Sequence, residues 1–177
     1  MPFTPYHFGP SGFVGLVLRR WIDLPVFLLA NVVLDLEVLI THSRAYGNTL
    51  LLGAAVGVLW GLAAYPLRGV FKRLMGLLRL PYKTGLVKMI ASGILGVWLH
   101  VVVDAMVHFD VRLLWPNKKF VLMRLITKPL SRANMTLTND RVELACKIML
   151  GLATIVYIFA AISFVKAQKA AKAENQT

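Results

Sequence analysis

The sequence has few acidic residues, a single cysteine and long stretches with no charge. Of its 177 residues 16% are charged and 58% are hydrophobic, whereas about a quarter of a soluble domain is charged. No charged residue occurs between Ala45 and Leu67. The single cysteine, Cys146, excludes a disulfide within the chain, and we expect it to be a small core residue. These deficits argue against a soluble enzyme and favour a membrane protein.

The charge that is present is mostly positive. The chain has 20 Lys and Arg residues against 8 Asp and Glu, a net charge of +12. The basic residues flank apolar runs and do not alternate with aromatics, so they do not fit a nucleic-acid-binding surface. We expect them to face the anionic headgroups of membrane lipids. The N-terminal "MPFTPYHFGPSG" lacks the basic start and apolar core of a cleavable signal, so insertion is expected through the mature helices.

Long apolar stretches predict an all-α membrane bundle of about four transmembrane helices. They cover residues 24–42, 45–67, 89–109 and 148–165. A helical pattern at 11–22 is too short to cross a bilayer. We therefore expect one membrane-embedded helical domain over residues 1–166, followed by a polar C-terminal tail over 167–177.

Residues 67–83 predict a basic amphipathic helix lying in the membrane surface. Four cations fall within about 60° on a helical wheel, and apolar residues cover the other side. These cations are Arg68, Lys72, Arg79 and Lys83. A basic solvated helix in a protein groove is the alternative.

The long connection over 110–141 is expected to cover a site, with Trp115-Pro116 as an interfacial anchor. Asp140, three residues before Glu143, is predicted to cap the last helix. With four spans, the N-terminal stretch, the 66–88 loop and the tail share one side. The positive-inside rule places that side in the cytoplasm.

Ionisable residues interrupt the apolar helices in a regular pattern. His100, Asp104 and His108 are spaced by four in "LHVVVDAMVH" and share one helix face. Asp35 and His42 are seven residues apart and share a face of the first long helix. Because the first and third long helices run in the same direction, we expect both sets to meet at one end of the bundle.

Three explanations fit this convergence. His–Asp hydrogen bonds could staple the helices, acids and imidazoles could relay protons or ions, or the set could bind zinc, manganese or iron. Three histidines and at least two acids gathered at one end favour the metal site, and the staple and the relay stay open.

Two segments resemble motifs of a known family. "HVVVDAMVHFDVRLLWP" is similar to the H-x3-D-x3-H and W-P elements of the YdjM-type family of inner-membrane, metal-dependent hydrolases. "FLLANVVLDLEVL" resembles that family's "PDiD" segment, and "MPFTPYH" resembles its N-terminal histidine element. The resemblance covers about residues 1–120. Here "LDLE" lacks the family's proline, and Asn48 stands where a second histidine is usual.

The resemblance implies an integral protein of the bacterial inner membrane, distantly similar in fold to the zinc-dependent phospholipase C group. It implies a divalent metal, zinc in the first place with manganese as the other possibility. The implied ligands are His7, Asp35, Glu37, His42, His100, Asp104 and His108. Under the four-span topology His7 starts on the far side, and it joins the site only if residues 8–23 re-enter the membrane.

If the chain is an enzyme, a metal would activate water at neutral pH. Glu37 or Asp110 could accept the proton, and Arg44 could neutralise phosphoryl oxygens. Arg44 could equally be a snorkelling residue, and His108 could be solvated beyond the helix. A site opening at the surface beside the basic amphipathic helix would suit a lipid or another phosphoester amphiphile. The competing class is a small non-enzymatic membrane protein with a helix staple or a proton path.

Overall fold

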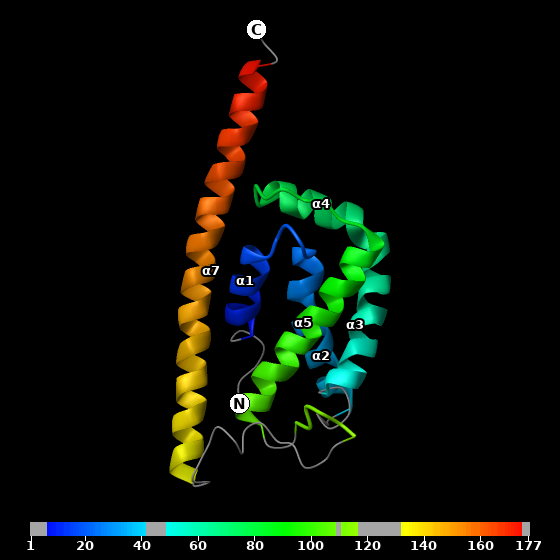
Figure 1. The fold of residues 1–177 in the computed structure, drawn as a ribbon, viewed down its shortest axis with the longest axis vertical. Helices are drawn as coiled ribbons and strands as arrows, with labels where there is room; N and C mark the ends of the chain where they lie inside the picture. Colours follow the sequence, from blue (N-terminus) through cyan, green and yellow to red (C-terminus); the bar gives the residue numbers. More distant parts are fainter. Residues whose placement is uncertain (1–6, 42–48, 109–110, 117–131, 175–177) are drawn as a thin grey trace.

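The computed structural model describes residues 7–41, 49–108, 111–116 and 132–174. These segments are helical apart from short turns and contain no β-strand, which confirms the all-α prediction. Figure 1 shows α7 along one side, α1, α2, α3 and α5 beside it, and α4 lying across one end of the group. We call this end of the bundle the α4 end.

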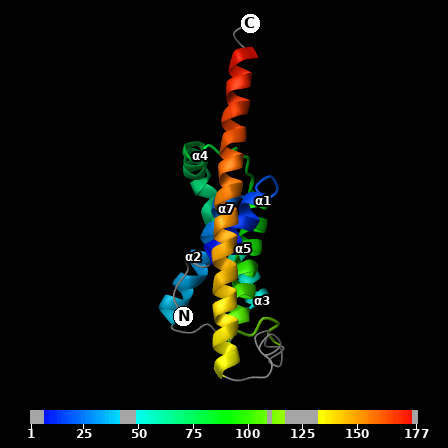
Figure 2. The same ribbon diagram turned by 90° about the vertical axis from the view of Figure 1, so that its left-hand side faces the viewer.

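The central helix is α5 (Leu86–Val107), which packs against α2 (Leu24–Thr41) and α3 (Leu50–Ala64). The short α1 (Phe8–Val17) packs mainly on α7 (Arg132–Glu174). Figures 1 and 2 agree that the C-terminal part of α7 extends beyond the other helices at the α4 end. The expected tail, as far as Glu174, therefore continues this helix.

Glycines bring the backbones of α3 and α5 into direct contact. A Cβ atom on Gly57 would lie 2.5 Å from the Cα of Ile94, and one on Gly93 would lie 2.3 Å from the carbonyl oxygen of Gly57. Small residues permit this approach, which favours helix association within a membrane. At the other end of α3, the indole N–H of Trp98 donates to the carbonyl oxygen of Leu50 at 2.8 Å, which fixes the register.

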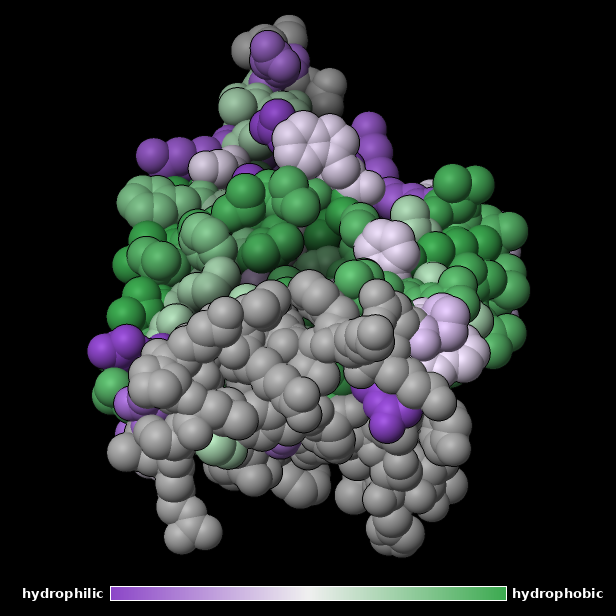
Figure 3. Space-filling model, turned by 60° about the horizontal axis from the view of Figure 1, so that its bottom comes forward, coloured by the Kyte–Doolittle hydropathy of each residue, from purple (hydrophilic) through white to green (hydrophobic). Residues whose placement is uncertain are grey.

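Among the described residues, three helical stretches are long and apolar enough to cross a membrane: Leu50–Leu77, Leu86–Val107 and Asn134–Glu174. Large apolar residues stay exposed along them, and hydrophobic side chains cover much of the surface in Figure 3. This pattern is that of a membrane protein. The predicted helix over 24–42 forms as α2, but its role as a fourth crossing stays a prediction.

The predicted amphipathic helix forms as α4 (Arg68–Leu77), which buries Phe71 and Met75 and exposes its cations. It ends earlier than the predicted residue 83, because Arg79 adopts a left-handed conformation with φ 55°. The N–H of Leu80 then donates to the carbonyl oxygen of Met75 at 2.9 Å, a bond that closes the helix end.

Arg19 and Arg20 lie at the α4 end with Lys83 and Lys88, as expected for the N-terminal stretch, but the start of that stretch does not. α1 and α2 form a hairpin whose turn, residues 18–23, lies at the α4 end, so the start of α1 lies near the opposite end (Figure 1). Ten helical residues span about 15 Å, too little to cross a bilayer. Residues 8–23 thus re-enter the bundle from the end at which α5 finishes.

The predicted cap at Asp140 is also wrong. α7 begins at Arg132, and Asp140 is an exposed residue inside it. Residues 132–140 contain no glycine or proline, so nothing in them interrupts the helix. Cys146, by contrast, is buried as expected, and it faces α1.

Candidate metal centre

The helices α2 and α5 run in the same direction, as the sequence predicted. Near their starts the backbone N–H of Asp23 donates to Ser92 Oγ at 2.6 Å. Further along, Asp35 Oδ1 lies 3.8 Å from His100 Nε2. Parallel packing therefore brings the acid of α2 beside the histidine and aspartate of α5.

Asp104 is the centre of the cluster and is almost fully buried. His7 Nε2 lies 3.0 Å from Asp104 Oδ1, within hydrogen-bonding distance. His100 Nε2 lies 3.6 Å from Oδ2, and His108 Nε2 lies 4.0 Å from Oδ1. These two separations exceed hydrogen-bond length. One carboxylate thus has three imidazoles around it but a short contact with only one.

His7 reaches this cluster because α1 packs tightly on α7. A Cβ atom on Gly9 would lie 2.0 Å from the carbonyl oxygen of Cys146, so only glycine permits the approach. Ser11 Oγ donates to the carbonyl oxygen of His7 at 2.6 Å. The His7 ring stacks on that of His100, with centroids 4.2 Å apart and planes 16° apart.

The imidazole of His100 lies near two carboxylates but forms no hydrogen bond with the described residues. The residue is 1% exposed, and within the described segments neither ring nitrogen has a hydrogen-bond partner. Nδ1 of His7 is also buried and has no hydrogen-bond partner among the described residues. Each buried polar atom left without a partner costs about 1–3 kcal/mol. This arrangement is costly unless another group occupies the cluster.

The donor set fits a divalent cation. His7, His100 and Asp104 each offer a ligand atom, and these atoms all lie within 4.8 Å of one another. Tetrahedral zinc with bonds of 2.0–2.1 Å separates its ligand atoms by about 3.3 Å. The closest approaches, 3.0 Å from His7 and 3.6 Å from His100 to Asp104, lie on either side of that value.

The cluster is more open on one side. The side chains of His7, Asp35 and His108 are 15%, 25% and 20% exposed, whereas His100 is completely enclosed. With neutral imidazoles, Asp35 and Asp104 carry two negative charges, which a divalent cation would balance. Asp35 and His108 thus border the side from which a substrate could approach.

Several predicted site residues lie outside the part of the chain that the structure describes. His42, Arg44 and Asp110 are not among the described residues, and only the backbone of Glu37, within α2, is described. Their proposed roles as ligands, bases or anion partners stay predictions.

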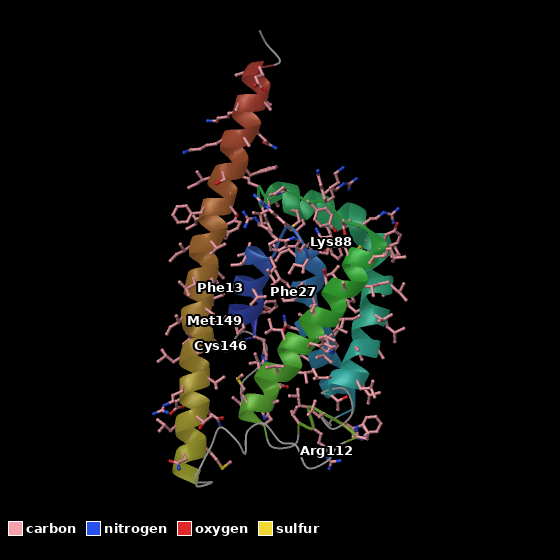
Figure 4. All side chains as sticks on the ribbon, viewed as in Figure 1. Phe13, Phe27, Lys88, Arg112, Cys146 and Met149 are labelled. Atoms are coloured by element: carbon pink, nitrogen blue, oxygen red, sulfur yellow. The ribbon has the colours of Figure 1, made fainter. Side chains whose placement is uncertain are left out.

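The expectation that the basic amphipathic helix flanks the site is wrong. α4 leads into the start of α5, whereas the cluster lies toward its end (Figure 1). Between Lys88, near that start, and Asp104 the helix rises about 24 Å. Figure 4 shows Lys88 near the α4 end and Arg112 at the other.

A second buried carboxylate, Asp23, was missed by the sequence reasoning. It caps α2, because the N–H of Val26 donates to its Oδ1 at 3.2 Å. Its Oδ2 accepts from Tyr82 Oη at 2.8 Å and from the hydroxyl of Thr84. An aspartate followed two residues later by a proline is a helix-start signal, and Asp23-Leu24-Pro25 carries it.

Comparisons of the chain with protein-family models, with curated proteins and with solved structures found no match. The resemblance to the YdjM-type hydrolases therefore stays an interpretation of the motifs.

Proposed function

We propose that the chain is a membrane-embedded, metal-dependent hydrolase whose metal is held by His7, His100 and Asp104. Asp35 and His108 complete the ligand set or border it. The observation that carries the proposal is His100, whose two buried ring nitrogens have no hydrogen-bond partner among the described residues. Zinc suits the imidazole donors, and manganese suits the carboxylates.

A cation held by these residues would make a nearby water more acidic and so supply hydroxide near neutral pH. The chain's own residues would then bind and orient. Before a cation binds, His7 donates a hydrogen bond to Asp104, and the stacked rings of His7 and His100 keep each other's orientation. Asp35, partly exposed beside His100, is placed to accept a proton.

The proposed substrate is a phosphoester of a lipid-like amphiphile at the membrane surface. The cluster lies within a bundle that exposes apolar side chains, so a substrate reaches it from the membrane or from its surface. Arg112 is an exposed cation at the same end of the molecule and could attract a phosphate (Figure 4). The proposed location is a bacterial inner membrane crossed about four times, with α2 as the fourth crossing.

A helix staple or a proton path is the second candidate. The hydrogen bond between His7 and Asp104 at 3.0 Å favours it, because such a bond would join α1 to α5 without any metal. The ring nitrogens of His100 weigh against it. They have no hydrogen-bond partner among the described residues, so they add no stability to a staple.

Elemental analysis of the detergent-purified protein separates the two candidates. We expect close to one zinc or manganese per chain in the wild type and none in His100→Ala/Asp104→Ala. Asp140→Ala is the matched control, because it removes an exposed carboxylate that is not part of the cluster and should keep the metal. A wild type that stays free of metal after incubation with zinc and manganese would exclude the hydrolase.

The variant Asp104→Asn gives a second test that separates the helix staple from the hydrolase. Asparagine still offers an oxygen to His7 but is a weak metal ligand. A staple would keep the protein folded with little change, and a hydrolase would lose metal and phosphodiesterase activity together. The activity is measured with phosphatidylglycerol in mixed micelles.

A further inference from the structure

A cationic pocket lies at the end of the molecule opposite the candidate metal centre. It has a volume of about 460 Å³, within the range of ligand-binding pockets. Four cations line it: Arg19 and Arg20 from the α1–α2 turn, and Lys83 and Lys88 from the segment that leads into α5. The C-terminal half of α7 forms the facing wall, with Phe164 and Ala167.

Two of these cations are held in place by the backbone. Lys88 Nζ donates to the carbonyl oxygens of Lys83 at 2.8 Å and of Arg20 at 3.3 Å. Arg19 Nη1 donates to the carbonyl oxygen of Leu16 at 2.9 Å. An ammonium has three N–H donors and a guanidinium has five. Both groups are thus fixed in position and keep donors for a ligand.

No acidic side chain lines the pocket, and within the described part of the chain none of its four cations forms an ion pair. The nearby carboxylate of Asp23 is occupied by the N–H of Val26 and by the hydroxyls of Tyr82 and Thr84. The charge of Asp23 acts on Lys88, but one carboxylate cannot balance four cations, so this concave site keeps a net positive charge that attracts an anion.

The wall formed by α7 supplies an apolar track beside these cations. Phe159 and Ile162, close to the pocket on α7, are 66% and 48% exposed. A smaller pocket of about 210 Å³ on the same stretch of α7 carries Arg79, Lys166 and Lys169. Cations beside an exposed apolar helix match an anionic headgroup with attached acyl chains.

We propose that the cationic pocket binds the phosphate headgroup of an anionic phospholipid, whose acyl chains lie along α7. The site is separate from the candidate metal centre and does not depend on the proposed hydrolase. By the positive-inside rule this end faces the cytoplasmic leaflet.

Native mass spectrometry of the full chain in detergent, titrated with dioleoylphosphatidylglycerol and with dioleoylphosphatidylcholine, tests the proposal. We expect the wild type to bind the phosphatidylglycerol at least about tenfold more tightly. The variant Arg20→Gln/Lys83→Gln/Lys88→Gln should lose this preference, since each cation near a membrane surface contributes about five- to tenfold.

The matched control is Arg68→Gln/Lys72→Gln/Arg73→Gln, which removes the same charge from exposed positions on α4, outside the pocket. It should keep the preference. Equal losses in the two triple variants would overturn the proposal, because diffuse surface charge would then explain the binding. No loss in either variant would overturn it as well.

A second pair of variants keeps every charge, in case the triple variant folds poorly. Ala167→Trp fills the pocket and should abolish the preference, whereas Ala171→Trp, one turn further along α7, should not. Glycerol phosphate at the same concentration should not displace the lipid. Complete displacement would assign the pocket to a soluble phosphate ester and overturn the lipid assignment.

Discussion

Two buried carboxylates lie toward opposite ends of the α2–α5 pair, and their surroundings differ. Asp23 accepts hydrogen bonds on both carboxylate oxygens, from the N–H of Val26 and from the hydroxyls of Tyr82 and Thr84. Asp104 is surrounded by imidazoles, of which only His7 is at hydrogen-bond distance. Both residues are more than nine-tenths buried, so burial by itself does not separate them.

The difference lies in the completeness of the polar contacts. At Asp23 the described donors satisfy the acceptor and join three segments, which is the arrangement of a structural lock. At Asp104 the neighbouring His100 keeps two buried nitrogens without partners within the described segments. A costly, incomplete network is expected where a ligand supplies the missing contacts. The comparison thus assigns a structural role to Asp23, and it supports the metal site proposed at Asp104.

The largest effect is expected at the structural lock. Asp23→Ala removes the cap of α2 and leaves the hydroxyls of Tyr82 and Thr84 without their acceptor. We expect a loss of about 3 kcal/mol in the free energy of unfolding, measured by circular dichroism during titration with sodium dodecyl sulfate. Asp23→Asn, which still caps the helix, should lose less. Equal stability of Asp23→Ala and the wild type would contradict the lock.

The next effect concerns the approach of α1 to α7. Gly9→Ala places a Cβ atom 2.0 Å from a backbone oxygen, so α1 must shift and carry His7 away from Asp104. We expect a loss of about 2 kcal/mol and a lower metal content by elemental analysis. Gly12→Ala is the control, because its Cβ atom would lie 3.5 Å from Ala153 Cβ, an ordinary contact. Similar effects of the two substitutions would argue against the close approach.

A smaller effect of opposite sign is expected at the candidate metal centre. In protein stripped of metal with a chelator, His100→Leu removes two buried nitrogens without partners. We expect unfolding to cost about 1 kcal/mol more than in the wild type, in the same detergent titration. A clear loss of stability would show that His100 is a structural residue and would favour the helix staple.

The smallest effect concerns alkaline pH. Burial, together with the hydrogen bond to Asp23, raises the pKa of Tyr82 above its ordinary value of about 10. Since the folded state holds this proton more tightly, the contribution of Tyr82 to stability is complete below pH 10 and decreases as the pH rises above it. Between pH 9 and 11 the wild type should lose more stability than Tyr82→Phe. Thermal unfolding is measured at each pH. An equal fall of the unfolding temperature with pH in the two proteins would contradict this assignment.

The sequence predicted a good part of the candidate metal centre. The spacing of His100, Asp104 and His108 placed them on one helix face, and the parallel course of two apolar helices brought Asp35 to the same end. The family resemblance named His7 as a ligand, but under a four-span topology it reaches the site only if residues 8–23 re-enter the membrane. Its position depends on how α1 packs on α7, a contact between residues more than a hundred positions apart.

The errors at the helix ends have local causes. The spacing of Asp140 and Glu143 imitates a helix cap, but the same spacing occurs on an exposed helix face, and α7 begins at Arg132. The early end of α4 depends on Arg79, whose left-handed conformation no short sequence pattern required. Asp23 carried a readable start signal, but its partners Tyr82 and Thr84 come from a segment some sixty residues away.

By itself the sequence indicated the class of this protein, because apolar runs of about 20 residues with few acidic residues are typical of helices that cross a membrane. It also determined which polar residues share a helix face, because that depends only on the helical repeat. The tertiary structure alone decided that Asp23 is bonded by two hydroxyls and a backbone N–H, whereas Asp104 lies among imidazoles. The partners His7, Tyr82 and Thr84 come from segments distant in sequence, and the helices approach one another closely at Gly9, Gly57 and Gly93.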